Sequence, residues 1–377
     1  MTTSPWLQRA LALDAADNPS AAVDELSRGT RAGDAPSARA LGMRLLIGDR
    51  APLLPDAGLQ FLGEACDAGL PEAAARAAGL LALGVRTPPN WALALTWLAR
   101  AAHGGWEPAQ RQLLALCDDR ALAARSAAQP AVIARSATQP GNADWTAIVA
   151  RSAAQPANTD WAAIARAVRH ADWRRSPAPT IRSDVPRVST FDDLVRPEIC
   201  DLLISFAVGR LEPARVYDPA RRQEIVVAHR SNTVAVFGVD SVEVVHVLMQ
   251  ARMAAACGLS ERCMEAPTVL HYAPGEQIRD HYDFVDPNIS DDYPAEIARN
   301  GQRLITFILY LNDDYDGGET AFPQLGFEHK GRRGGGIYFV NALPDLSPDT
   351  RMLHAGRPTT RGEKWIVTQF IRDRPMR

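Results

Sequence analysis

The chain has few cysteines, no excess of charge and no long apolar run, and each of these absences excludes a class of protein. Its five cysteines are odd in number and include no Cys-x-x-Cys pair. We therefore expect free thiols in a reducing cytoplasm, and neither a disulfide framework nor a zinc site. The 41 Lys and Arg residues against 44 Asp and Glu residues leave a net charge of −3, which argues against general binding to nucleic acid or to an acidic membrane surface.

Apolar segments are short throughout the sequence. No segment approaches the roughly 18 uncharged apolar residues that indicate a transmembrane helix, so we expect no membrane contact. The first residues do not combine a basic start with an apolar run, so we expect no secretory signal. A chain of 377 residues, 46% of them hydrophobic, is long enough for two or three domains with packed cores.

The first third of the chain is rich in Ala and Leu and repeats itself at an interval of 36 residues. Small residues at fixed positions allow two helices to approach closely, and a glycine after a helix ends it in a left-handed turn. A period near 36 is typical of a helical solenoid. One copy holds Phe61, Leu62, Ala65 and Gly69, and the next holds Trp97, Leu98, Ala101 and Gly105 at the same positions. A weaker copy before them holds Leu26, Gly29 and Gly33.

This pattern resembles the Sel1-like repeat, a relative of the tetratricopeptide repeat, over about residues 20–117. The resemblance implies helix pairs that bind a protein segment on their concave face. A plain Ala-rich helical bundle is the alternative interpretation. We assign residues 1–118 to this helical repeat domain, with a protein partner as the binding function that the resemblance implies.

Residues 119–180 have a different composition and are predicted to form a connector. Nearly identical heptapeptides begin at Ala124, Ala134 and Ala150, and each contains a Gln-Pro pair. Proline cannot continue a helix, so the connector should contain short helices separated by turns.

Residues 181–377 are predicted to form a domain of short strands with two helices, which makes the whole chain α+β. Many short strands separated by Gly- and Pro-rich turns are typical of a β-sandwich or barrel. The expected helices are residues 191–204 and 242–257. The expected strands are residues 225–228, 233–237, 268–272, 304–311, 336–341 and 365–371.

The sequence His281-Tyr282-Asp283 is the main candidate for chemistry. On a strand, residues i and i+2 point to the same face, so an imidazole and a carboxylate would lie together. His354, just before the last strand, is the best third ligand. Two histidines and one carboxylate suit iron(II) in oxygenases, because they leave other coordination positions open. Each residue alone has an ordinary explanation, a solvated turn for the first pair and a structural role for His354.

Lys364 opens the last predicted strand, ten residues after His354. The cosubstrate 2-oxoglutarate chelates such a metal at one end, and its distal carboxylate needs a cation deeper in the barrel. Lys364 on a strand beside His354 would provide that cation, whereas an isolated lysine would be interpreted as a surface residue.

An ordered set of motifs surrounds these residues over about residues 190–373. The set resembles the prolyl 4-hydroxylases, most closely the plant, algal and microbial members. The resemblance implies a double-stranded β-helix, or jelly roll, and hydroxylation of an unactivated C–H bond with release of succinate and carbon dioxide. The motifs are His271-Tyr272, Gly275, His281-Tyr282-Asp283, Arg303-Leu304-Ile305-Thr306, Tyr310-Leu311-Asn312-Asp313, Gly317-Gly318-Glu319-Thr320, Phe322-Pro323, His354 and Gly362-Glu363-Lys364-Trp365.

By this resemblance His281, Asp283 and His354 match the iron ligands, and Lys364 matches the residue that pairs with the distal carboxylate of 2-oxoglutarate. The implied cofactors are iron(II), 2-oxoglutarate and dioxygen, with ascorbate as a further candidate. The roles are carried over from the family one position at a time.

Four further residues are candidates for binding the cosubstrate. Tyr310 and Thr368 match hydroxyl donors to its distal carboxylate, and Tyr272 matches a tyrosine near the metal. Thr306 lies on the same predicted strand face as Tyr310 and is included for that reason. Tyr310 has an alternative interpretation as an ordinary strand aromatic.

The chain departs from the collagen-type enzymes at positions that lie near the substrate in the family. Phe284-Val285-Asp286-Pro287 stands where those enzymes carry an Arg, and Phe339-Val340 replaces a Trp. The substrate therefore stays open between proline in a peptide or protein and a free proline-like imino or amino acid. A repeat-based binding module with a silent barrel is the competing function, and the intact metal set together with Lys364 argues against it.

Overall fold

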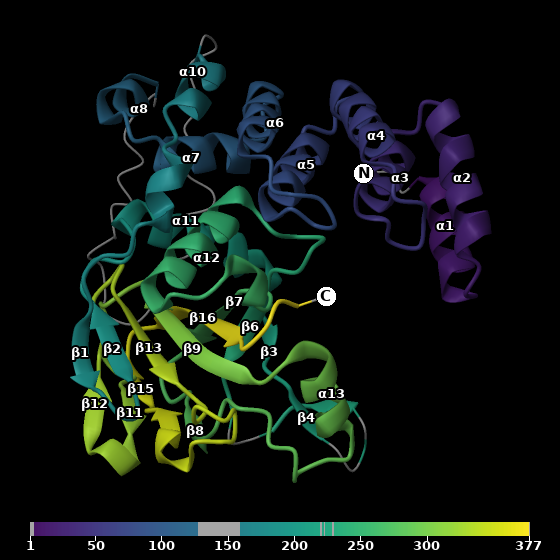
Figure 1. Ribbon diagram of the computed structural model, residues 1–377. Helices are drawn as coiled ribbons and strands as arrows, with labels where there is room; N and C mark the ends of the chain where they lie inside the picture. The colour runs from purple at the N-terminus through teal and green to yellow at the C-terminus, as the bar shows by residue number, and fades with distance from the viewer. Residues whose placement is uncertain (1–3, 127–158, 219–220, 222, 228–229, 377) are drawn as a thin grey trace. The chain divides into compact units, whose positions relative to one another are not determined.

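The computed structural model describes residues 4–126, 159–218, 221, 223–227 and 230–376 (Figure 1). These residues fall into two compact units. Described residues of the first unit lie within 4–126, 159–170 and 239–247, and those of the second within 171–238 and 248–376. Most of the predicted connector, including its second and third heptapeptides, lies outside the described residues. No helix among the described residues is both long enough and apolar enough to span a membrane.

The first unit consists of paired helices. Its second, fourth and sixth helices begin at Pro19, Pro55 and Trp91, so the predicted interval of 36 residues is confirmed (55 − 19 = 36; 91 − 55 = 36). The helices are α1 (Pro5–Ala15), α2 (Pro19–Arg31), α3 (Ala35–Ile47), α4 (Pro55–Asp67), α5 (Glu72–Leu83), α6 (Trp91–His103), α7 (Glu107–Leu116), α8 (Arg120–Ser126) and α10 (Trp161–Arg166).

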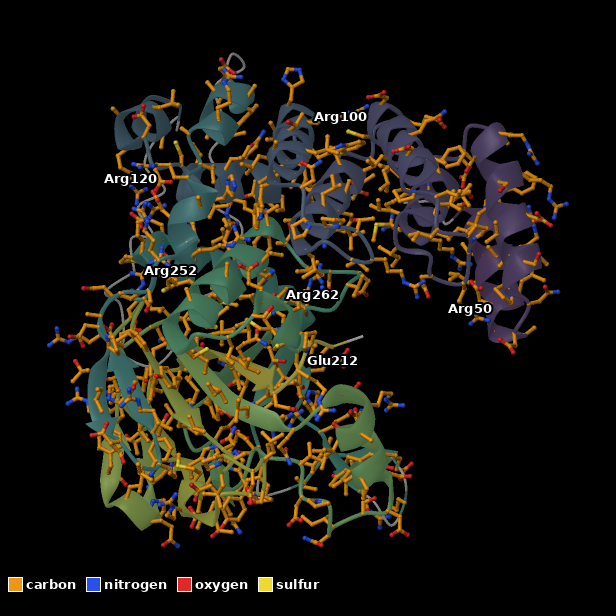
Figure 2. The ribbon with its side chains drawn as sticks, viewed as in Figure 1. Arg50, Arg100, Arg120, Glu212, Arg252 and Arg262 are labelled. Carbon is orange, nitrogen blue, oxygen red and sulfur yellow. The ribbon has the colours of Figure 1, made fainter. Side chains whose placement is uncertain are left out.

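The repeated small residues have the roles that the sequence predicts. Gly33, Gly69 and Gly105 follow α2, α4 and α6 with φ of 80°, 92° and 87°, a conformation that favours glycine. Ala65 and Ala101 are fully buried where neighbouring helices meet. Successive pairs also contact through longer side chains, since the Nη2 of Arg100 on α6 lies 2.8 Å from Asp67 Oδ1 and 3.2 Å from the Gly63 carbonyl. Arg100 is labelled in Figure 2.

Residues 239–247 lie in sequence between two strands of the second unit, β6 (Thr233–Val236) and β7 (Thr268–Tyr272), but belong to the first unit. Arg76 on α5 forms an ion pair with Glu243, and both side chains are almost fully buried. Gln112 on α7 donates to Glu243 Oε2 (3.2 Å) and accepts from the backbone N–H of Val245 (2.7 Å). Buried ionic and polar groups that are satisfied in this way fix the position of the segment against these helices.

The second unit is built on two sheets. An eight-stranded sheet has the order β1-β2-β13-β9-β16-β7-β6-β3, and a four-stranded sheet has the order β12-β11-β14-β8. The large sheet contains β1 (Thr180–Ser183), β2 (Val188–Phe191), β3 (Glu212–Pro213), β6 (Thr233–Val236), β7 (Thr268–Tyr272), β9 (Arg303–Tyr310), β13 (Gly336–Val340) and β16 (Lys364–Arg372). The small sheet contains β8 (Ile278–His281), β11 (Thr320–Phe322), β12 (Phe327–His329) and β14 (His354–Gly356).

Two short two-stranded sheets and several helices complete this part of the chain. One two-stranded sheet is a hairpin of β4 (Val216–Asp218) and β5 (Gln223–Ile225), and the other pairs β10 (Asp316–Gly317) with the distant β15 (Thr359–Arg361). The longer helices are α11 (Pro197–Ala207), α12 (Val244–Cys257) and α13 (Asp292–Asn300).

The core of the second unit lies between the large and small sheets. Ile308 of β9, Ile337 of β13 and Ile366 of β16 pack in one buried cluster with Phe322 of β11. Side chains from two facing antiparallel sheets that share one core define the double-stranded β-helix. The predicted fold class, a jelly roll preceded by helical repeats, is confirmed.

The helix expected over residues 191–204 is wrong at its start. Residues up to Phe191 form β2, where the ring of Phe191 stacks on Phe307 at 5.7 Å, and α11 begins only at Pro197. Proline disfavours a helical conformation in the preceding residue and suits the first helical position, and Arg196 is accordingly extended. The strand expected over residues 225–228 is also displaced, because β5 ends at Ile225.

Candidate active site

His281, Asp283 and His354 converge at one end of the small sheet. His354 opens β14 and lies opposite His281, the last residue of β8, with ring centroids 4.2 Å apart. The Asp283 carboxylate lies between the imidazoles, with Oδ2 3.1 Å from His354 Nε2 and Oδ1 3.5 Å from His281 Nε2. Within the part of the chain that the structure describes, these residues form the one group of three or more donors that can hold a metal ion.

The local structure that brings these residues together differs from the one that we expected. We expected His281 and Asp283 on one strand face, but β8 ends at His281 and Asp283 lies beyond it. The cross-strand pairing of His281 with His354 brings the imidazoles together, and the chain after β8 turns the carboxylate toward them.

Both histidines are held in the form that binds a metal. His281 Nδ1 lies 2.8 Å from the Arg279 carbonyl, and His354 Nδ1 lies 3.0 Å from the Met352 carbonyl. A carbonyl only accepts, so each Nδ1 must carry a hydrogen, which leaves the Nε2 lone pair facing Asp283 when the ring is neutral. Such second contacts fix the tautomer and ring orientation of metal-binding histidines. The residues therefore fit a divalent metal.

Charge at the group also favours a cation. Burial acts to raise the pKa of Asp283, but the charge and hydrogen bonds of His354 and His281 outweigh it and hold that pKa well below its usual range. Burial acts to lower the pKa of His354, and the Asp283 carboxylate outweighs that effect and raises it. The carboxylate is thus negatively charged in a protected position, where a metal can replace the imidazole protons.

Lys364 is a buried cation without a buried anion beside it. Its side chain is 1% exposed, and its Nζ donates to the Gly318 carbonyl at 2.7 Å and lies 4.9 Å from the ring centre of Tyr272. Among the described residues, no carboxylate forms an ion pair with it. Burial lowers the pKa of Lys364 to about 8, against the opposing charge of Glu319. Burying an unpaired charge is unfavourable, so this position suits an anionic ligand.

The position of Lys364 in the sheets differs from the expectation. Its strand β16 pairs with β7 and β9 in the large sheet, whereas His354 lies in the small sheet. Lys364 and His354 nevertheless line the same cavity, of about 750 Å³. Two other cations near this part of the chain, Arg303 and Arg361, are already paired, since Arg303 contacts Glu265 through two nitrogens (2.8 and 2.9 Å) and Arg361 contacts Asp316.

The remaining candidates lie around the same cavity. Tyr272 lies opposite Lys364 in the β7–β16 pairing, and Thr368 also lines the cavity. Tyr310 is not one of the lining residues, but it is fully buried, and its hydroxyl forms a hydrogen bond (2.9 Å) with Oγ1 of Thr320, which lines the cavity. Burial raises the pKa of Tyr310 and of Tyr272, so both hydroxyls stay protonated and can donate. Their roles in cosubstrate binding stay predictions.

Thr306 also lines the cavity, but its hydroxyl contacts the metal group. Its Oγ1 donates to Asp283 Oδ2 at 2.7 Å. Phe339, one of the residues that depart from the collagen-type pattern, packs edge-on against His354 with ring centroids 4.7 Å apart. Phe284, which follows the His-x-Asp sequence, is buried and stacks on Tyr282.

Sequence reasoning missed the residues at the mouth of the cavity. Tyr217 of β4 donates to Asp292 Oδ2 of α13 at 2.9 Å, and its ring lies 6.2 Å from that of Tyr293. Arg215, directly before β4, and Arg299 of α13 also line the cavity. No motif or spacing in the sequence marks these residues, because the hairpin and the helix are about 75 residues apart and meet only in the fold.

Comparison with known proteins finds relatives of this part of the chain. Residues 267–372 match the family model of the 2OG-Fe(II) oxygenase superfamily. A probable prolyl 4-hydroxylase 7 of Arabidopsis thaliana is 28% identical over 204 residues, which cover 49% of this chain and 62% of that protein. The C-terminal half of this chain is an oxygenase domain of the prolyl 4-hydroxylase type. Its cofactors are those in the name of its superfamily, iron(II) and 2-oxoglutarate, and the His-Asp-His group and the buried Lys364 fit both.

Other relatives extend the comparison. The prolyl 4-hydroxylase subunit alpha-1 of Gallus gallus is 28% identical, and the match covers 51% of this chain and 36% of that one. The chain thus spans less than two thirds of the length of these relatives. A viral collagen prolyl hydroxylase from Paramecium Bursaria Chlorella virus-1, solved with 2OG, is 27% identical and covers 49% of this chain and 94% of its own, with a TM-score of 0.38. A Sel1 repeat protein from Oxalobacter formigenes is 29% identical over 27% of this chain and 81% of its own, with a TM-score of 0.23.

Proposed function

We propose that this oxygenase domain hydroxylates a prolyl residue in a peptide or protein. The observation that carries the proposal is the buried cation Lys364 in the same cavity as the His281, Asp283 and His354 group. The cavity offers three metal donors at one position and an uncompensated positive charge at another. A metal that is chelated by a dicarboxylate would satisfy both.

The side chains divide the work in this proposal. His281, Asp283 and His354 hold iron(II), and Lys364 pairs with the distal carboxylate of 2-oxoglutarate. When bound, the two cofactors supply the chemistry that adds one oxygen atom of dioxygen to a C–H bond and that leaves succinate and carbon dioxide. The buried rings of Phe322 and Phe339 pack against His354 and exclude water from that side of the site.

Two hydroxyl groups complete the proposed cosubstrate site. Tyr310 lies opposite Ile366, which is two residues along β16 from Lys364. Thr368 is two residues further along the same face of β16. A buried carboxylate requires several donors, and neutral hydroxyls can supply them beside the one cation. Tyr310 and Thr368 would therefore orient the distal carboxylate, and Tyr272, opposite Lys364, would contact the cosubstrate.

The cavity mouth supports a peptide as the substrate. The volume of about 750 Å³ lies in the upper part of the range for ligand sites, which leaves space beside a cosubstrate for more than one amino acid. Tyr217, Tyr293 and the exposed Tyr282 and Ile289 line this mouth. Aromatic grooves suit proline-rich segments, which already adopt an extended helix with little entropy to lose. Relatives of this domain are named prolyl 4-hydroxylases, in agreement with this choice.

A succinate-release assay tests the proposal. Purified full-length protein is supplied with iron(II), 2-oxoglutarate and ascorbate, and with a proline-rich peptide, free proline or pipecolate in parallel reactions. Of the three substrates, we expect only the peptide to give succinate above background, together with hydroxyproline in the peptide. Turnover only with a free imino acid would contradict the peptide assignment. No turnover with any C–H substrate, from a protein that binds both cofactors, would favour a silent barrel.

A further inference from the structure

A chain of three buried polar side chains connects β13, β9 and the proposed metal group. Asn341, the residue after β13, donates from Nδ2 to Thr306 Oγ1 at 2.9 Å, and Thr306 donates from Oγ1 to Asp283 Oδ2 at 2.7 Å. Asn341 is 0% exposed and Thr306 is 1% exposed. Water therefore does not compete for these bonds, and the chain of donors is a fixed part of the site.

The hydrogen positions in this chain follow from the chemistry of its ends. A threonine hydroxyl has one hydrogen and can turn it toward either neighbour. The amide nitrogen of Asn341 only donates, so the hydroxyl must accept from it and direct its single hydrogen to the Asp283 carboxylate. The reversed amide would place the Asn341 oxygen against Thr306, and the Thr306 hydroxyl would donate its hydrogen to that oxygen. Lone pairs of Thr306 Oγ1 and Asp283 Oδ2 would then face each other with no hydrogen between them. The orientation with Nδ2 toward Thr306 is therefore the favourable one.

We infer that Asn341 and Thr306 are positioning residues that hold the Asp283 carboxylate in one metal-binding orientation. This inference rests on the proposed role of Asp283 as a metal ligand. The hydrogen bond fixes the rotation of the carboxylate about its Cβ–Cγ bond. It acts on Oδ2, the carboxylate oxygen that lies 3.1 Å from His354 Nε2. Coordination by one oxygen leaves the further metal positions open, as an iron(II) oxygenase requires.

Thr306 was also a candidate for direct contact with the cosubstrate, and the two roles predict different measurements. A contact to 2-oxoglutarate would affect its affinity and leave metal binding alone unchanged. A positioning role at Asp283 would affect metal binding before any cosubstrate is added. Replacing partners of a metal ligand typically lowers metal affinity by roughly 10–100-fold.

The probe is cobalt(II) alone, which is titrated into the full-length protein without 2-oxoglutarate and is followed by calorimetry and by its visible spectrum. Thr306→Val keeps the shape of the side chain and removes the hydroxyl. We expect it to weaken cobalt binding by roughly 10–100-fold and to change the spectrum. Thr306→Ser, which restores the hydroxyl, should recover most of the affinity.

Asn341→Asp tests the direction of the hydrogen bonds. An aspartate there accepts the Thr306 hydrogen and takes it away from Asp283, so the loss of cobalt affinity should match that of Thr306→Val. The double variant should bind cobalt no more weakly than either single variant. If Asn341→Asp does not fold, Asn341→Leu replaces it. That variant only frees the hydroxyl to rotate, and we expect a loss of a few fold. The matched control is Thr190→Val, which removes another buried hydroxyl from the same large sheet, and it should bind cobalt normally.

The outcomes separate this inference from the proposed function. If the unmodified protein binds no cobalt, or binds it equally well after His281→Ala, the metal assignment itself is wrong. If His281→Ala abolishes binding and Thr306→Val leaves affinity and spectrum unchanged, only the positioning role is wrong. A Thr306→Val protein with normal cobalt binding and weak 2-oxoglutarate binding would overturn the inference in favour of direct cosubstrate contact.

Discussion

His354 lies directly opposite His281 in the antiparallel pairing of β14 with β8, and their ring centroids are 4.2 Å apart. Residues 73 positions apart in the sequence (354 − 281 = 73) thus form one side of the metal group through a single backbone pairing. The small sheet therefore sets the distance between the two imidazoles, while Asp283 completes the group from the chain that follows β8.

Removal of the carboxylate ligand should abolish turnover without loss of the fold. Asp283→Ala leaves two histidine ligands and exchanges a buried charge for a small apolar side chain. We expect no succinate above background, while circular dichroism shows that the secondary structure is retained. A chelator should produce the same loss reversibly. Full activity of Asp283→Ala would rule out the three-ligand assignment.

Lys364 should contribute to 2-oxoglutarate binding but not to metal binding. Removing one member of a buried ion pair costs roughly 3–5 kcal/mol, and each 1.4 kcal/mol is tenfold in affinity. Lys364→Met should therefore weaken 2-oxoglutarate binding by two to three orders of magnitude, as measured by the absorption of the anaerobic iron complex. Because the ligand-free protein then no longer buries an unpaired cation, its melting temperature should stay equal or rise. Unchanged 2-oxoglutarate affinity would mean that another group anchors the cosubstrate.

The same residue predicts a pH dependence of opposite sign for stability and for binding. Burial lowers the pKa of Lys364 to about 8 in the folded, ligand-free protein, below its value in the unfolded chain. Above about pH 8 the unfolded state therefore binds more protons at this residue, and its contribution to stability rises with pH until the unfolded lysine also titrates.

Affinity for 2-oxoglutarate should change in the other direction, since the distal carboxylate needs the protonated amine. We expect the dissociation constant to increase as the pH rises through 8 in calorimetric titrations. Lys364→Arg keeps its charge in that range and is the matched control, with weaker but pH-independent binding. Parallel pH profiles of the two proteins would show that the pH effect arises elsewhere.

The buried ion pair of Arg76 with Glu243 should stabilise the helical unit. Arg76→Ala leaves the Glu243 carboxylate buried without its cation and with the hydrogen bond from Gln112, so the free energy of unfolding should fall by roughly 3–5 kcal/mol. Urea titration of the helical circular dichroism signal measures this loss. The control is Arg187→Ala, which removes the surface pair with Asp184 and should cost less than about 1 kcal/mol. Equal effects of the two substitutions would contradict a structural role for residues 239–247.

The sequence was informative where chemistry imposes a fixed spacing. The 36-residue interval predicted the helix pairs, and the ordered motifs include His281, Asp283, His354 and Lys364, which line one cavity. The contact of Thr306 with Asp283 was not predictable, because strand periodicity gives the face of a side chain and not the partner across it. The packing of residues 239–247 against α5 and α7 was missed for a similar reason. Apolar residues at helical spacing indicate a buried face without indicating what covers it.

The most direct test of the central claim is peptide hydroxylation by the full-length protein, compared with Asp283→Ala under identical conditions. Mass spectrometry of a proline-rich peptide and quantification of succinate are carried out on the same reaction. Our account predicts one oxygen atom added at proline for each succinate formed, and neither product with Asp283→Ala. Peptide-independent succinate in equal amount, or hydroxylation that persists in Asp283→Ala, would contradict it.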